Sequence, residues 1–147
     1  MAILLPGGAG YIGSHTAVEL LNEGKEVVIV DNFSNSKPEI LEKIKQITGK
    51  DFKFYELDCL DKKALEKVFE ENKIEAVINF AGFKAVGESV KKPIEYYMNN
   101  ITGALTILEV MKEYNCKKFI FSSSATVYGE PEKIPITEDC KTGGTTN

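Results

Sequence analysis

The sequence LLPGGAGYIGSH at residues 4–15 joins a short apolar run to the beginning of a helical pattern. Within it, Gly7, Gly10 and Gly13 have the spacing G-x-x-G-x-x-G. A strand, a glycine turn and a helix in this order present free N–H groups and the positive end of the helix to an anion, and a pyrophosphate fits that description. We expect Gly7 and Gly10 to allow a tight turn and close approach of the phosphates, and Gly13 to let helix and strand pack closely. A glycine-rich turn that binds nothing is the alternative.

An acidic residue further along the chain favours nucleotide binding over a plain turn. Asp31 follows the second apolar run, where a carboxylate can accept hydrogen bonds from both ribose hydroxyls of an adenosine. The 2′-phosphate of NADP would meet a like charge there, so we expect NAD as the cofactor. No Lys-Ser/Thr pair follows the glycines, which excludes a Walker-type phosphate loop.

Short β-rich runs alternate with helical patterns along the rest of the chain. The continuous apolar runs VVIV (27–30) and AVI (76–78) are typical of parallel strands that are covered on both faces. With right-handed crossovers, we predict an α/β fold with a doubly wound, Rossmann-like parallel sheet of five strands. We expect Asp61 to cap its helix, Gly24 to end one, and Pro38 and Pro93 to lie in first turns. The predicted strands are 2–5, 26–30, 52–56, 76–80 and 118–122, and the predicted helices are 11–22, 38–48, 61–72 and 93–114.

Length and composition limit which class of protein this can be. The 147 residues, 43% hydrophobic and 27% charged, predict one globular unit, with an NAD-binding domain over 1–128 and a loop-rich tail over 129–147. The net charge of -4 is interspersed, which argues against nucleic acid as a partner. No apolar run approaches the roughly 20 residues that span a membrane, and no basic leader precedes one, so we expect a cytoplasmic protein without a membrane partner. Cys59, Cys116 and Cys140 have no metal-binding or disulfide spacing, so we expect no metal.

Longer stretches carry a more specific resemblance. VDNFSNSK (30–37), FAGFKAVGESVKKP (80–93), YYMNN (96–100) and FIFSSSATVYG (119–129), together with the glycine spacing, resemble the extended short-chain dehydrogenase/reductase family. Within that family the UDP-glucose 4-epimerases are the most similar group, and the resemblance covers only the first part of such an enzyme. It implies NAD as the cofactor and the interconversion of UDP-glucose and UDP-galactose, with a nucleotide-sugar partner only in a complete enzyme.

The resemblance also implies roles for individual residues. Ser124 is implied as the catalytic residue that hydrogen-bonds the reacting sugar hydroxyl, and Lys84 and Thr126 as further substrate contacts. Because His15 is the only histidine and has no partner pattern, a serine-hydrolase triad is excluded. The residues implied for the cofactor are Tyr11 and Ile12 at the pyrophosphate, Asp31, Asn32, Asn35 and Ser36 at the ribose, Asp58 and Cys59 at the adenine, and Phe80, Ala81, Gly82, Lys84 and Asn99 along the remainder.

The sequence departs from the family pattern at three points. The family's base is a tyrosine in Tyr-x-x-x-Lys, whose pKa the lysine lowers, and no such pair follows Ser124. We therefore expect no epimerase activity from these residues alone. Pro6 stands where the family usually has threonine, and we expect it just past the strand ladder, stiffening the entry to the turn. Asn79 stands where the family often has histidine.

Two other functions remain open from the sequence. One is a non-catalytic dinucleotide-binding or self-associating module, because Phe119, Ile120 and Phe121 are expected at a sheet edge. With the predicted helix 93–114 as a second contact surface, we expect a homo-oligomer. The other is a part of a different sugar-nucleotide enzyme, such as another epimerase or a decarboxylase.

Overall fold

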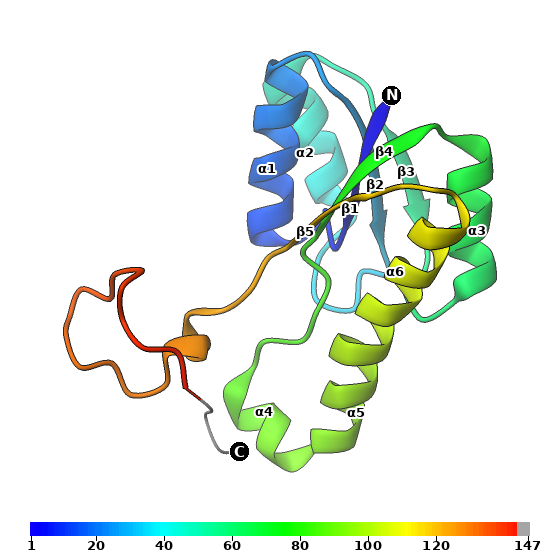
Figure 1. Ribbon diagram of the computed structural model, residues 1–147. Coiled ribbons are helices and arrows are strands. Elements are labelled where there is room, and N and C mark those ends of the chain that lie inside the picture. Colours follow the sequence, from blue (N-terminus) through cyan, green and yellow to red (C-terminus); the bar gives the residue numbers. More distant parts are fainter. Residues whose placement is uncertain (144–147) are drawn as a thin grey trace.

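The computed structural model describes residues 1–143 and contains a five-stranded parallel sheet (Figure 1). The strand order is β3-β2-β1-β4-β5, with every neighbouring pair parallel. The chain therefore runs outward from the centre to one edge and then crosses to the other side of β1. The strands are β1 (Ala2–Pro6), β2 (Glu26–Asp31), β3 (Lys53–Glu56), β4 (Ile74–Asn79) and β5 (Lys118–Phe121).

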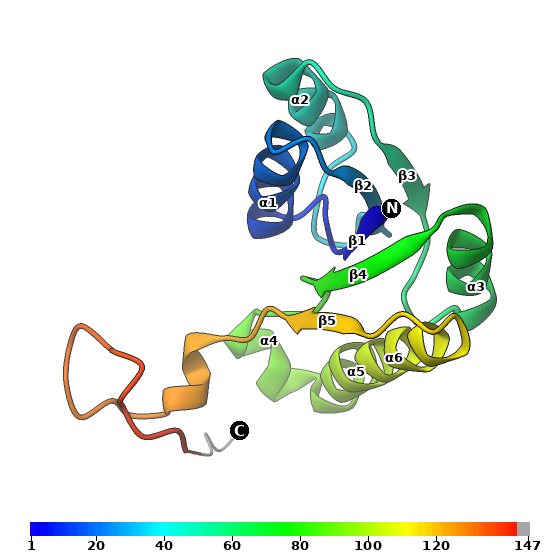
Figure 2. The same ribbon diagram turned by 45° about the horizontal axis from the view of Figure 1, so that its top comes forward.

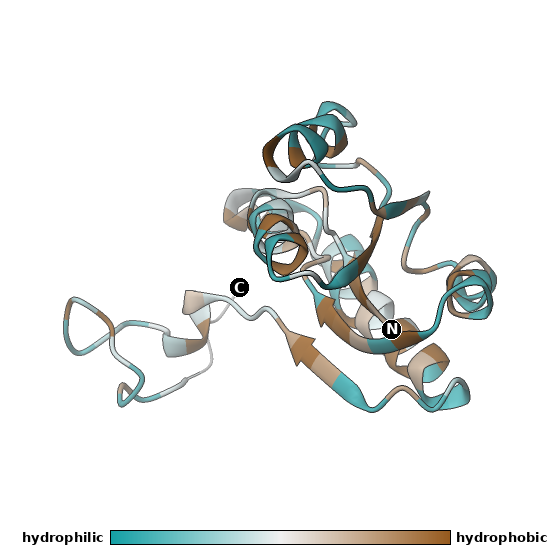
Figure 3. Ribbon diagram, turned by 90° about the horizontal axis from the view of Figure 1, so that it is seen from above, coloured by the Kyte–Doolittle hydropathy of each residue, from teal (hydrophilic) through white to brown (hydrophobic). Residues whose placement is uncertain are grey.

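Helices cover both faces of the sheet, as the continuous apolar strands predict (Figure 2). On one face Leu5 and Ile29 pack with α1 (Tyr11–Asn22) and α2 (Glu39–Thr48). On the other, Leu4 and Val28 pack with α3 (Lys62–Glu71) and α6 (Gly103–Glu113). Seen from above, the apolar strands lie between helices that combine hydrophilic and hydrophobic residues (Figure 3). The doubly wound α/β fold is thereby confirmed.

The crossover fixes where a ligand can bind. From β1 the chain leaves toward β2 on one side, and β4 lies on the other side of β1, so the strand order reverses between β1 and β4. At their carboxyl ends, the Phe80 N–H donates to the Pro6 carbonyl at 2.8 Å, and the Gly7 N–H donates to the Val30 carbonyl at 2.8 Å. A reversal of this kind opens a crevice at the carboxyl edge of a parallel sheet.

Pro6 differs from the sequence-based expectation. It is the last residue of β1, in register with Val30, rather than a residue past the ladder. A proline can end a strand inside a sheet because only its N–H is missing, whereas its carbonyl still accepts from Phe80. The turn begins at Gly7, whose N–H is occupied by Val30.

The predicted helix 93–114 was wrong as one regular helix. The segment consists of α5 (Pro93–Tyr97), a π-helical turn η1 (Met98–Thr102) and α6, and a further short helix α4 (Val86–Lys91) precedes it. Apolar residues continue at helical spacing through the π turn, so periodicity did not reveal it. α4 has only six residues, which is too short for a periodic pattern to show.

The expected helix ends are largely confirmed. The Asp61 side chain caps α3 by accepting from the Ala64 N–H at 3.1 Å, and Gly24 follows α1 with a φ of 75°. Pro93 is the first residue of α5, whereas Pro38 lies in the N-cap position of α2, one residue before the helix. The strand limits differ from the predicted ones by one or two residues.

The chain after β5 leaves the sheet. A single 3₁₀ turn, η2 (Ala125–Tyr128), is followed at 129–143 by a segment without helix or strand, which extends away from the domain (Figure 1). Residues 144–147 of the predicted tail lie outside the described residues. Over residues 1–143, no helix is both long enough and apolar enough to cross a membrane.

Candidate functional site

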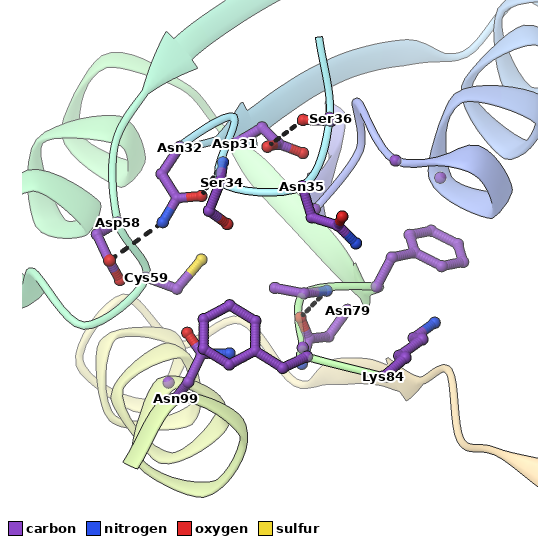
Figure 4. A pocket seen from close by; sticks show the side chains of 18 of the residues that line it. Asp31, Asn32, Ser34, Asn35, Ser36, Asp58, Cys59, Asn79, Lys84 and Asn99 are labelled. Atoms are coloured by element: carbon purple, nitrogen blue, oxygen red, sulfur yellow. Dashed lines mark hydrogen bonds between the residues drawn. The ribbon is translucent and has the colours of Figure 1, made fainter. Parts of the chain in front are cut away.

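A cavity of about 330 Å³ lies at the carboxyl edge of the sheet (Figure 4). Its wall comes from the glycine turn after β1, the loops after β2, β3 and β4, and the π turn with the start of α6. The volume is in the range of small-molecule sites, and the position is the one that the reversal of strand order predicts. The cavity is therefore the candidate binding site.

The glycines of the turn are packed closely against other backbone atoms. Gly7 has a φ of 72°, and a Cβ built on it would lie 2.6 Å from the Ala81 backbone nitrogen. A Cβ on Gly13 would lie 2.6 Å from the Gly7 carbonyl oxygen, and one on Gly10 would lie 3.2 Å from the same oxygen. The turn therefore packs backbone to backbone against α1 and against the segment after β4, and close approach of phosphates to Gly7 and Gly10 stays a prediction.

The N-terminus of α1 points its backbone toward the cavity. Gly10 is the N-cap residue, and within the described residues no side chain caps the helix. The first N–H groups of a helix have no partner inside it, so those of Tyr11 and Ile12 are available to an anion. Both residues line the cavity and have exposed side chains.

Asp31 ends β2 and ties the glycine turn to the loop that follows. Its Oδ2 accepts from the Ala9 N–H at 3.0 Å, while its Oδ1 accepts from the Phe33 N–H at 2.9 Å and from the Ser36 hydroxyl at 2.8 Å. Asp31 is 9% exposed, so these bonds hold its carboxylate at a fixed place beside the turn. A ribose hydroxyl that binds Oδ1 would compete with Ser36 for it.

The loop after β3 forms the next part of the wall. Asn32 Nδ2 donates to Asp58 Oδ2 at 3.1 Å, and this bond joins the loops after β2 and β3 (Figure 4). Burial, and then the carboxylates of Asp58 and Asp31, raise the pKa of the Cys59 thiol to about 12. At neutral pH the thiol is protonated, so Cys59 offers shape and a weak hydrogen bond rather than a nucleophile.

Amide side chains hold the segment after β4. Asn79 is buried, and its Oδ1 accepts from the Ala81 N–H at 3.1 Å. Further along, Asn100 Oδ1 accepts from the Phe83 N–H at 2.7 Å, and Asn100 Nδ2 donates to the Phe83 carbonyl at 2.9 Å. Lys84 and Asn99 lie beside these contacts and line the cavity (Figure 4).

The structure gathers the predicted cofactor residues around this one cavity. They come from the ends of β1, β2, β3 and β4 and from one helical segment, at the edge where ligands bind in open parallel sheets. Which of them contact NAD stays a prediction. The lining includes Gly7, Gly10, Tyr11, Ile12, Gly13, Asp31, Asn32, Asn35, Ser36, Asp58, Cys59, Phe80, Ala81, Gly82, Lys84 and Asn99.

Six further lining residues were missed from the sequence. Ser34, Asn79 and Phe83 are immediate neighbours of predicted residues, so their place in the chain could have indicated them. Gly103 and Ala104 follow Asn99 by about one helical turn, and Leu57 precedes Asp58. A Cβ on Gly103 would lie 3.9 Å from Cys59, so this glycine marks a close packing of helix and loop.

The candidate catalytic residue Ser124 and the candidate substrate contact Thr126 stand apart from the cavity. Ser124 and Thr126 are exposed and are not among the lining residues. Ser124 caps η2: its Oγ accepts from the Thr126 N–H at 3.3 Å and from the Thr126 hydroxyl at 3.0 Å. Among the described residues, no cluster of three or more His, Cys, Asp or Glu side chains could hold a metal ion.

Comparisons with known proteins agree with the predicted resemblance. The family model described as NAD dependent epimerase/dehydratase family matches residues 3–147. The UDP-glucose 4-epimerase of Haemophilus influenzae is 66% identical over 147 residues, 100% of this chain and 44% of the relative, and that of Bacillus subtilis is 63% identical over 145 residues, 99% and 43%. The crystal structure of UDP-glucose 4-epimerase from Bifidobacterium longum in complex with NAD+ and UDP has a TM-score of 0.95 and 58% identity, covering 100% of this chain and 44% of that one. The chain thus spans less than half the length of these relatives.

Proposed function

Because the chain belongs to the NAD dependent epimerase/dehydratase family, we propose that it is the NAD-binding part of a UDP-glucose 4-epimerase. The observation that carries the proposal is the cavity, where an uncapped helix N-terminus and a buried carboxylate meet across a glycine turn. The epimerase from Bifidobacterium longum, which this chain resembles over its full length, binds NAD+ and UDP.

The residues present fit a dinucleotide on chemical grounds. A pyrophosphate needs backbone N–H donors with no side chain in the way, and the turn lines the cavity with Gly7, Gly10 and Gly13, which have no side chains. A ribose needs an acceptor for two hydroxyls, and Asp31 supplies a carboxylate beside the cavity, at which a ribose hydroxyl would replace the Ser36 hydroxyl on Oδ1. The adenine would lie between the loops after β2 and β3, which the bond from Asn32 to Asp58 holds together.

Bound NAD would supply the oxidation and reduction that invert one carbon of the sugar. The chain's own residues would bind and orient the cofactor: the turn and α1 hold the phosphates, Asp31 fixes the ribose, and the segment after β4 with Lys84 lies along the rest. By resemblance, Ser124 would hold the reacting hydroxyl, which requires the segment after β5 to approach the cavity. Lys84 and Thr126 are the further substrate contacts in this proposal.

A comparison of NAD with NADP by calorimetry tests the cofactor assignment. We expect NAD to bind at least about tenfold more tightly, because the 2′-phosphate would lie against the Asp31 carboxylate. Asp31→Asn removes that charge and should narrow the difference. Asp51→Asn, which removes an exposed carboxylate paired with Lys45 at the far end of the sheet, is the matched control. If calorimetry detects no binding of NAD, the proposed function is wrong.

The absence of a Tyr-x-x-x-Lys pair after Ser124 favours a second candidate, binding of NAD without turnover by these 147 residues alone. A coupled epimerase assay tests it, and near-normal turnover would contradict it. Residues 1–128 form the NAD-binding unit in either case. The proposal also includes a cytoplasmic location, which the free cysteines Cys59, Cys116 and Cys140 fit, and a homo-oligomer.

A further inference from the structure

Asn100 does not line the cavity, yet its side chain contacts two residues that do. Its Oδ1 accepts from the Phe83 N–H at 2.7 Å and from Asn99 Nδ2 at 2.9 Å, and its Nδ2 donates to the Phe83 carbonyl at 2.9 Å. One amide therefore uses its acceptor twice and its donor once. Phe83 belongs to the segment after β4 and Asn99 to the π turn, so Asn100 joins two walls of the cavity.

The segment after β4 depends on this contact for its far end. At its near end, Phe80 is bound to Pro6 and Ala81 to Asn79. Beyond Ala81 the backbone passes through Gly82, with a φ of 158°, and reaches Phe83. The Phe83 ring lies 5.2 Å from that of Tyr96, and the Phe83 backbone is held by Asn100. Lys84 follows directly, so its reach over the cavity is set by where Phe83 is fixed.

The π turn explains how one helical segment can both line the cavity and hold the backbone of Phe83. Asn99 and Asn100 are consecutive residues of η1, and Asn99 faces the cavity while Asn100 reaches the backbone of Phe83. π turns are rare and are frequently found at functional sites. The two bonds to Phe83 give this irregularity a physical reason.

We propose that Asn100 is a positioning residue for NAD binding, which fixes Phe83, and through it Lys84, and which orients Asn99 toward the cofactor. The inference rests on the proposed function, because NAD is the ligand whose binding it affects. Asn100 itself would not touch the cofactor.

The test uses Asn100→Ala in the full chain, with two readouts. Amide hydrogen exchange of Phe83, measured without NAD, should accelerate because its acceptor is gone. Titration with NAD should give about tenfold weaker binding, since loss of the two hydrogen bonds to Phe83 and of the one from Asn99 frees the wall that the cofactor must order. Asn100→Asp keeps the size and the accepting oxygen but loses the donor to the Phe83 carbonyl, and it should weaken NAD binding at least about threefold. This variant keeps the test decisive if Asn100→Ala fails to fold.

Asn72→Ala is the matched control. Asn72 is a buried amide that donates to the Val68 carbonyl at 2.8 Å and to the Tyr55 hydroxyl at 2.9 Å, and it lies at the opposite end of β4. The control should lower the free energy of unfolding but leave NAD affinity within twofold. Equal weakening of NAD binding in the control, unchanged affinity in both Asn100 variants, or an unchanged Phe83 amide would each overturn the inference. If the unaltered chain takes no NAD, the proposed function fails, and Phe83 exchange then decides separately whether Asn100 holds this segment.

Discussion

Gly7 is required by two separate constraints on the same backbone. Its φ of 72° is a conformation that side chains disfavour, and a Cβ would lie 2.6 Å from Ala81 N and 2.8 Å from the Phe80 carbonyl carbon. These neighbouring atoms belong to backbone that is itself hydrogen-bonded to β1, so moving them away would cost free energy. Gly49, at the end of α2, has a similar φ of 63° but nothing within 4 Å.

A comparison of Gly7 with Gly49 separates the cost of a left-handed backbone conformation from the cost of a steric clash. We expect Gly49→Ala to lower the free energy of unfolding by about 1–2 kcal/mol, the cost of the left-handed conformation alone. Gly7→Ala should cost clearly more, because the contact with Ala81 adds to the same strain, and it should also abolish NAD binding. Urea unfolding and calorimetry measure the two effects. Equal losses of stability in both variants would show that the turn can move away from Ala81.

Some residues of the site could be predicted from the sequence and others could not. Gly7, Gly13 and Asp31 are predictable because a missing side chain or a charge after a strand has few other uses. Asn79 and Asn100 were not predicted as structural supports, because an amide can bind almost any polar group. Which backbone group lies opposite an amide is decided only when distant segments meet.

At the level of elements, the N-cap of α3 was the feature most directly predictable from the sequence. Asp61 precedes a pattern of apolar residues at helical spacing, and in the structure its Oδ1 accepts from the Ala64 N–H at 3.1 Å. The bond is local, so the sequence contains all the information that it needs. The π turn η1 is the opposite case, because it accompanies contacts with Phe83, 17 residues away in the chain.

The cap gives a prediction about α3. Asp61→Ala should lower the free energy of unfolding by about 1 kcal/mol, because the N–H of Ala64 loses its acceptor at the helix N-terminus. Asp61→Asn retains an oxygen acceptor and should restore most of that loss. Thermal or urea unfolding of the two variants measures this, and NAD affinity should remain unchanged since α3 does not line the cavity. An alanine variant as stable as the unaltered chain would show that α3 needs no cap.

On the scale of the whole molecule, we compare two of the surfaces on which the described residues expose apolar side chains. One is the β5 edge, where Ile120 is 59% exposed on a strand with a neighbour on one side only. The other is a stripe along α5, η1 and α6, whose spacing of three or four residues places its members on one side of the helical segment. We name it the helical stripe, and its exposed members are Ile94, Tyr97, Ile101, Leu105 and Leu108.

Of the two surfaces, the helical stripe is the better candidate for contact with a second copy. It continues over three helical elements, and a row of large apolar side chains of this length is unusual on the surface of a monomer. The β5 edge has only four residues, and the Phe119 and Phe121 rings contact each other at 6.4 Å. A short edge strand offers few backbone groups for pairing.

Substitution on each surface decides between them. Leu105→Glu places a charge in the centre of the helical stripe and should raise the dissociation constant of a dimer at least about tenfold, because the charge would have to be buried. Ile120→Thr should leave association nearly unchanged, and so should Ile47→Glu, a matched control at an exposed apolar residue of α2. Sedimentation velocity over a range of concentrations measures all three. Dissociation by Ile120→Thr alone would place the contact at β5, and a monomer at every concentration of the unaltered chain would show that neither surface joins two copies.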